Sequence, residues 1–404
     1  MRRALILAAA LAAGPLAAQQ PPPIGIATPA LPAEPQVFDT AEQHGIKVSV
    51  VARGFARPFA IEPLPNGDLL IVERGVGLRL VRGATGVSPV LVEGLVPGVP
   101  EDHPEIFSYG VTDIALHPDF ARNGWIYFTW NAFAPLPEGT SQLQRPGFFK
   151  VLRGKWADGA MRDIETILET KNARYAGGTR VHVAKDGKVW VATTGPYDGA
   201  AQDLSDVYGK VLRLNEDGSI PADNPFVGRE GVHPAIYSYG HRDQHGLTVH
   251  PETGQAFTVE HGPNGGDEAN LIEAGGNYGW PTYSYGRNYD GTALTELPFG
   301  PDTKRPLIVW LPSIAPSGLL FYTGDKFPAW KGNLFVGSAR WGEINHTGSL
   351  QRVVLSPDLG ELRREALLEQ LHHRVRDVAQ GPDGMIYVLT DGPENAVLRI
   401  EPAE

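Results

Sequence analysis

The chain has 404 residues, a formal net charge of −11 and no cysteine. The missing cysteines exclude disulfides, thiolate metal ligands and a cysteine nucleophile, and the acidic balance argues against a nucleic-acid partner. The 48 glycines and 35 prolines, with only 20% charged residues, are typical of short strands joined by tight turns.

The N-terminus has the pattern of a secretory signal peptide. Arg2 and Arg3 precede an apolar run over residues 4–13 that is too short to span a bilayer, and Ala18 ends a stretch suited to cleavage. An uncleaved anchor is the alternative interpretation. Residues 1–18 are therefore expected to be removed, residues 19–40 form a Pro/Ala-rich lead-in, and the protein is expected to be periplasmic or secreted, with no later membrane span.

One sequence motif occurs six times after the lead-in: a glycine-containing turn followed by a strand of alternating apolar residues. Consecutive copies are separated by roughly 50 to 80 residues, which leaves room for one four-stranded propeller blade plus its loops. The six turn glycines are Gly67, Gly124, Gly187, Gly254, Gly332 and Gly384.

This repeat predicts an all-β fold, a six-bladed β-propeller over residues 41–404. The last strand, near 397–400, is expected to join the strand near 46–51 and close the ring, which removes exposed sheet edges. A β-sandwich or a pair of β-domains is the alternative. In propellers the loops at one end converge on the central channel, so the working site is expected at one channel mouth.

Two loops in the middle of the chain concentrate polar and charged residues. The first, residues 237–247, contains Arg242, Asp243 and His245, and the second, residues 260–270, contains Glu260 and His261. Such a density of ionisable groups between strands is costly unless the groups pair or bind a ligand. A polar network that locks neighbouring blades together is the alternative explanation.

These segments resemble the soluble pyrroloquinoline quinone (PQQ)-dependent glucose and aldose-sugar dehydrogenases, a glucose/sorbosone dehydrogenase-like family. The resemblance extends from about residue 54 to residue 402. The short motifs that carry it occur at residues 113–120 (DIALHPDF), 239–242 (YGHR), 260–263 (EHGP), 265–268 (GGDE), 277–281 (NYGWP), 313–318 (SIAPSG) and 374–378 (RVRDV).

The resemblance implies PQQ across the channel mouth, a Ca²⁺ ion that polarises the quinone, and a His that accepts the proton of a sugar hydroxyl. It implies that the backbone carbonyls of Gly262 and Pro263 bind Ca²⁺, which prefers oxygen ligands. Planar guanidinium groups suit the carboxylates of PQQ. The implied cofactor residues are Arg242, Ser313, Arg374, Arg376 and Arg340, the last at a position where the family usually has Lys.

The chain departs from the family pattern at the general base. The His position is Ala176, which cannot accept a proton, and a gapped alignment would place Tyr175 there instead. The supporting carboxylate is also displaced, with Asp198 following Pro196. A family Asn has become Asp243, and a Gln near the cofactor aligns with Ser108.

Four histidines could supply the missing base: His182, His241, His245 and His261. His182 alternates with valines on a strand and is expected to be structural, and His241 belongs to the family motif itself. We therefore predict His245 and Asp243 as the catalytic residues.

The sequence favours a PQQ- and Ca²⁺-dependent oxidoreductase that oxidises a sugar or another alcohol or aldehyde. Its partners would be a small-molecule substrate and a periplasmic electron acceptor. The alternative is a PQQ-free, metal-dependent propeller hydrolase of lactonase type, or an isomerase, that uses Asp243, His245, Glu260 and His261. A binding propeller without turnover is a third interpretation, because propellers support unrelated functions.

Overall fold

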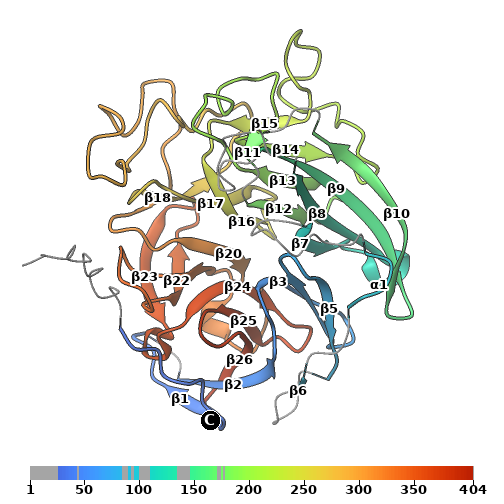
Figure 1. The fold of residues 1–404 in the computed structure, drawn as a ribbon, viewed down its shortest axis with the longest axis vertical. Coiled ribbons are helices and arrows are strands. Elements are labelled where there is room, and N and C mark those ends of the chain that lie inside the picture. The colour runs from blue at the N-terminus through green and yellow to red at the C-terminus, as the bar shows by residue number, and fades with distance from the viewer. Residues whose placement is uncertain are drawn as a thin grey trace, which may run out of the picture.

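The protein is described by a computed structural model that covers residues 26–403 except 43–44, 84–89, 92–94, 100–109, 134–145, 171–173 and 176–177. Nearly all of its regular structure is β, in six small sheets arranged around one axis (Figure 1). The predicted six-bladed β-propeller is confirmed. The expected signal peptide and the family base position lie outside the described residues.

Each of the first three blades is a separate antiparallel sheet. Blade 1 contains β3 (Pro58–Pro63), β4 (Leu69–Glu73) and β5 (Gly77–Val81). Blade 2 contains β7 (Gly110–Leu116), β8 (Trp125–Phe133), β9 (Pro146–Ala157) and β10 (Ala160–Glu169), with β11 (Arg174–Tyr175) beside β9 and the short helix α1 (Phe120–Asn123) before β8. Blade 3 contains β12 (Thr179–Val183), β13 (Val189–Thr193), β14 (Lys210–Leu214) and β15 (Ile236–Tyr239).

The other three blades complete the circle. Blade 4 contains β16 (Asp243–Val249), β17 (Ala256–His261), β18 (Asp267–Leu271) and β19 (Ile308–Trp310). Blade 5 contains β20 (Pro316–Phe321), β21 (Leu334–Ser338), β22 (Ser349–Leu355) and β23 (Glu361–Leu367), with 3-10 turns at Pro328–Trp330 and Glu369–Leu371. Blade 6 contains β24 (Arg374–Gln380), β25 (Ile386–Asp391), β26 (Ala396–Pro402), β2 (Ile46–Arg53) and β1 (Gln36–Phe38), with β6 (Val90–Leu91) beside β2.

The ring closes as the sequence predicted. Strand β2 pairs antiparallel with β26, from Ile46 opposite Pro402 to Arg53 opposite Ala396. Lys47 and Glu401 add an ion pair of 2.6 Å across this junction. N- and C-terminal strands therefore share one blade, so separating the ends of the chain would open the ring.

Apolar side chains fill the spaces between blades. Among the described residues they form six clusters, and each cluster joins two neighbouring blades. The one between blades 5 and 6 includes stacked rings of Phe327 and Trp330, with centroids 4.4 Å apart. Because every blade shares its core with both neighbours, the inner strands are held at fixed positions around the axis.

The inner strands β3, β7, β12, β16, β20 and β24 line a central channel (Figure 1). The channel contains a cavity of about 210 Å³ to which all six strands contribute. Its wall carries Glu62, Asp113, Arg180 and Asp377, and Arg180 lies 3.1 Å from Asp113 and 3.9 Å from Asp377. Gly318 lies against Asp377, whose carboxylate a side chain at this position would hit.

The lead-in crosses blades 5 and 6 before it joins β2. The Ile26 N–H and carbonyl bond to Asn345 and His346, and Leu31 bonds to Glu394. Among residues 26–403 that the structure describes, no helix is long and apolar enough to span a membrane.

Candidate active site at the channel mouth

Irregular pairing of the inner strands shapes one end of the channel. In five of the six blades a register shift interrupts the pairing of the inner strand with the second strand, near its mouth end. Such bulges re-aim a side chain. They place Phe59 in blade 1, His245 in blade 4 and Arg376 in blade 6 at this mouth.

Arginine and histidine side chains from several blades pack around the Phe59 ring. The guanidinium carbons of Arg74, Arg180 and Arg376 lie 4.4, 4.6 and 5.4 Å from the centre of its ring. The ring of His245 meets Phe59 edge to face at 6.2 Å. Phe59 thus provides an aromatic ring against which guanidinium groups from several blades pack in cation–π contacts.

A cavity of about 460 Å³ lies between blades 4, 5 and 6 at this end of the molecule. Three of its lining residues are predicted or considered site residues: His261, Arg340 and Arg374. His346 also lines it, on the loop after Arg340. Its size lies within the range of small-molecule sites.

The predicted cofactor arginines differ in how they are paired. Arg376 is buried and its Nε lies 2.9 Å from Asp391 Oδ2, so its charge is balanced within the protein. The side chain of Arg374, two residues away, is exposed and has no hydrogen bond or ion pair to any described residue. Arg340 forms a long ion pair of 3.4 Å with Glu343 at a solvent-accessible position, so its charge is weakly paired.

Arg242 links the arginines to the predicted calcium loop. Its Nη1 donates to the His261 carbonyl at 2.5 Å, and its Nη2 donates to the Tyr197 hydroxyl at 3.1 Å. Its Nε is buried and has no hydrogen-bond partner among the described residues. The guanidinium is therefore held in place through its two terminal nitrogens.

The predicted calcium ligands lie in a tight turn after β17. A side chain at Gly262 would come within 2.1 Å of the Gly265 carbonyl oxygen, so only glycine fits. The Pro263 carbonyl accepts from the Arg287 N–H at 2.8 Å and keeps a second lone pair. The Gly262 carbonyl accepts no hydrogen bond from the described residues.

Asp267 ties this turn to the Ser313 loop of the next blade. Its fully buried carboxylate accepts from the N–H of Gly262 at 2.9 Å, the N–H of Ile314 at 2.8 Å, the N–H of Ala315 at 2.6 Å and the Ser313 hydroxyl. Burial raises the pKa of Asp267, and these donors oppose the rise. One carboxylate thus positions both Gly262 and Ser313.

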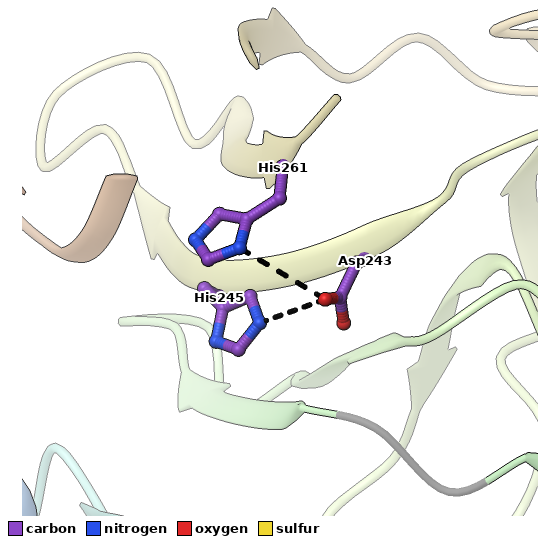
Figure 2. Close-up of side chains that lie close together, drawn as sticks. All are labelled: Asp243, His245 and His261. Carbon is purple, nitrogen blue, oxygen red and sulfur yellow. Dashed lines mark ion pairs between the residues drawn. The ribbon is translucent and has the colours of Figure 1, made fainter. Parts of the chain in front are cut away.

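Asp243, His245 and His261 form a compact cluster beside the arginines (Figure 2). His245 Nε2 lies 3.1 Å and His261 Nδ1 lies 3.9 Å from Asp243 Oδ2, and the two imidazole rings stack at 4.1 Å. Burial alone would raise the pKa of Asp243, but His245, His261 and Arg242 outweigh it and hold this pKa far below its usual range. The carboxylate is therefore ionised.

The ring nitrogens of the two histidines have different contacts. His245 Nε2 faces the Asp243 carboxylate and can donate to it, while His245 Nδ1 is buried without a partner among the described residues. His261 Nε2 lies 2.7 Å from the Pro316 carbonyl and donates to it. Its Nδ1 faces Asp243, and burial lowers the pKa of His261 well below the ordinary value.

The His245 ring lies against the start of blade 3. A side chain at Gly178 would come 3.2 Å from His245 Nδ1. The imidazole from blade 4 therefore packs on Gly178, just before β12. Ala176 itself and Ser108 fall outside the described residues.

The remaining candidates are held in other contacts. His241 is fully buried between Glu260 at 3.0 Å and the Ser238 hydroxyl at 2.8 Å, and burial lowers its pKa to about 3 while raising that of Glu260 to about 8. His182 lines the channel below the mouth, where burial lowers its pKa to about 4. Asp198 accepts from the Ala200 N–H in a turn.

Several site residues were not identified from the sequence. They are Phe59, Arg74, Tyr197, Asp267 and Asp391. Asp267 stood inside the GGDE motif, which could have directed attention to it. The others lie in segments whose side-chain direction depends on bulges and on contacts between blades distant in sequence.

The fold is that of a six-bladed β-propeller with a cluster of arginines, histidines and acids at one channel mouth. The chain belongs to the glucose/sorbosone dehydrogenase family, whose model matches residues 55–399. It is 37% identical over 383 residues to the uncharacterized protein slr1608 of Synechocystis (89% of this chain, 88% of the relative). It is 32% identical over 371 residues to the aldose sugar dehydrogenase YliI of Escherichia coli (88% and 93%). The PQQ-bound aldose sugar dehydrogenase of Streptomyces coelicolor superimposes with a TM-score of 0.64 at 26% identity (92% and 99%).

Proposed function

We propose that this protein is a PQQ- and Ca²⁺-dependent periplasmic oxidoreductase that oxidises a sugar or another alcohol or aldehyde and passes the electrons to a periplasmic acceptor. Membership of a sugar-dehydrogenase family supports the reaction class. A PQQ-bound relative of the same fold supports the cofactor. The signal-peptide pattern of residues 1–18 supports the compartment.

The observation that carries the proposal is the unbalanced positive charge at the mouth. Arg374 has no partner among the described residues, Arg242 keeps a free Nε, and Arg340 is weakly paired. Guanidinium groups whose donors are not used by protein carboxylates can bind a polycarboxylate through charge-assisted hydrogen bonds. PQQ carries three carboxylates, so these side chains fit it.

The calcium loop fits a hard cation. The Gly262 carbonyl has no donor among the described residues, and Pro263 keeps a free lone pair. Asp267 holds the Gly262 N–H, which fixes the peptide plane and with it the adjacent loop. Oxygen donors of this kind suit Ca²⁺.

When bound, PQQ would supply a two-electron acceptor and Ca²⁺ would act as its Lewis acid. Oxidation of a sugar hemiacetal to a lactone also releases the hydroxyl proton, and this proton must be accepted by the protein. We assign that role to the cluster of Asp243, His245 and His261, because the Asp243 carboxylate lies beside both rings and would stabilise the imidazolium that forms when one of them accepts the proton. His245 Nδ1 is covered by Gly178, whereas His261 lines the mouth cavity, so the proton would enter the cluster from the cavity side.

Reconstitution tests the proposal. The mature chain is titrated with PQQ in the presence of Ca²⁺ while the quinone absorbance is followed, and dye reduction is then measured with aldoses, alcohols and aldehydes. Saturation near one equivalent followed by turnover supports the proposal. Absence of binding at micromolar PQQ would contradict it.

The same cluster favours one alternative, a metal-dependent hydrolase without PQQ. The ligand atoms of Asp243, His245 and His261 all lie within 4.8 Å of one another, as in sites with two histidines and one carboxylate. Glu260 does not join them, because it bonds to His241. Tight Zn²⁺ or Mn²⁺ binding with lactone hydrolysis, and no PQQ binding, would select this function.

A further inference from the structure

Arg74 is a mouth residue to which the proposed function gives no role. It follows β4 in blade 1, half-buried, and its backbone N–H donates to the Arg57 carbonyl at 3.0 Å. Its guanidinium lies over the Phe59 ring at 4.4 Å. The aromatic face fixes the plane of the guanidinium without using its hydrogens.

No acceptor in the described part of the chain meets this guanidinium. The side chain of Arg74 has no hydrogen bond or ion pair there, and its Nε is buried. Comparable arginines do have carboxylate partners: Arg79 lies 2.6 Å from Glu73, and Arg352 lies 2.6 Å from Glu365. Arg74 therefore differs from Arg79 and Arg352 in having no carboxylate partner among the described residues.

The surroundings of Arg74 are cationic. Burial, together with the charges of Arg376, Arg374 and Arg180, lowers its pKa to about 9, and Asp391 opposes this effect. Asp391 is already bound to Arg376 through Nε at 2.9 Å. A guanidinium in this position destabilises the empty protein unless an anion binds beside it.

We propose that Arg74 binds a carboxylate of the ligand at the channel mouth, acting from blade 1 together with Arg374 from blade 6. The guanidinium groups of Arg74 and Arg376 lie over the same Phe59 ring, and of these two only Arg376 has a carboxylate partner among the described residues. Where that ligand is PQQ, the inference rests on the proposed function.

The test compares Arg74→Leu and Arg74→Lys with Arg82→Ala, a control that removes an exposed arginine from the same blade. PQQ is titrated into each protein with Ca²⁺. We expect Arg74→Leu to bind about tenfold to hundredfold more weakly, as for loss of a charge-assisted hydrogen bond, with Arg74→Lys between it and the wild type. The control should bind like the wild type.

A second readout separates binding from structure. If Arg74 is uncompensated in the empty protein, Arg74→Leu leaves the apo melting temperature unchanged or raises it, while PQQ affinity falls. Wild-type affinity in Arg74→Leu, or a lower apo melting temperature that accounts for weaker binding, would overturn the inference.

A further measurement distinguishes failure of this inference from failure of the proposed function. Should the wild type not bind PQQ, citrate would serve as a tricarboxylate probe in thermal-shift measurements at constant ionic strength. Stabilisation of the wild type and the Arg82→Ala control, but not of Arg74→Leu, would retain Arg74 as a carboxylate-binding residue. Equal shifts, or no shift in any protein, would refute it.

Discussion

Replacement of Asp243 by Asn probes the proton-accepting cluster directly. The Asp243 carboxylate lies 3.1 Å from His245 Nε2, and the Thr194 hydroxyl lies 3.1 Å from its other oxygen. At 3.1 Å and an effective dielectric of about 20, attraction between a carboxylate and an imidazolium is on the order of 5 kcal/mol. Desolvation of the pair offsets part of this, so we expect about 3–4 kcal/mol to be lost from the transition state.

That loss corresponds to a fall in kcat of about 10²- to 10³-fold. Asn removes a negative charge beside the arginines, so PQQ affinity should stay equal or rise. Asn is also the residue that the family resemblance implies at this position. The assay is dye reduction at saturating substrate, with PQQ binding measured separately. Asp217→Asn, the same change at an exposed turn outside the site, is the control. A kcat within threefold of the wild type would refute the assignment of Asp243.

Three further changes test other parts of the site. Arg374→Ala should weaken PQQ binding about tenfold or more without lowering the apo melting temperature. Arg376→Ala should also destabilise the fold, because it leaves Asp391 without its arginine partner. Equal apo melting temperatures of the two variants would contradict this difference. Asp267→Asn should lower Ca²⁺ affinity in a calcium titration and cost about 2–4 kcal/mol in urea unfolding, since it replaces an acceptor of several buried donors; unchanged values would disprove its positioning role. Burial beside other channel acids raises the pKa of Glu62 from an ordinary 4.5 to about 8, so the folded state retains a proton that the unfolded chain loses, and stability should fall as pH rises from about 4.5 to 8. In urea unfolding at pH 5 and pH 8.5, Glu62→Gln should lessen that fall by up to about 2 kcal/mol, and an identical pH dependence would exclude this explanation.

Much of the fold could be predicted from local sequence. Each glycine turn, such as Gly187 between β12 and β13, repeats a left-handed backbone position, with φ of 80° there, and the strand beyond it alternates. Ring closure followed because a propeller leaves no free sheet edge. The expected pairing of 46–51 with 397–400 is the observed pairing of β2 with β26.

The site was only partly predictable, because its geometry depends on bulges and long-range pairing. Sequence motifs identified Arg374 and Arg376 as equivalent arginines, but Asp391 neutralises only Arg376. Nothing in the local sequence of Phe59 or Arg74 indicates that one stacks on the other. These contacts arise where separate blades meet at the axis.

The central claim is that one channel mouth holds a quinone and a calcium ion together. A crystal structure of the mature chain with PQQ and Ca²⁺ tests it most directly. We predict cofactor carboxylates at Arg242 and Arg374 and the ion at the Gly262 and Pro263 carbonyls. A mouth that stays without quinone under saturating PQQ, or a metal bound instead by Asp243 and His245, would contradict the claim.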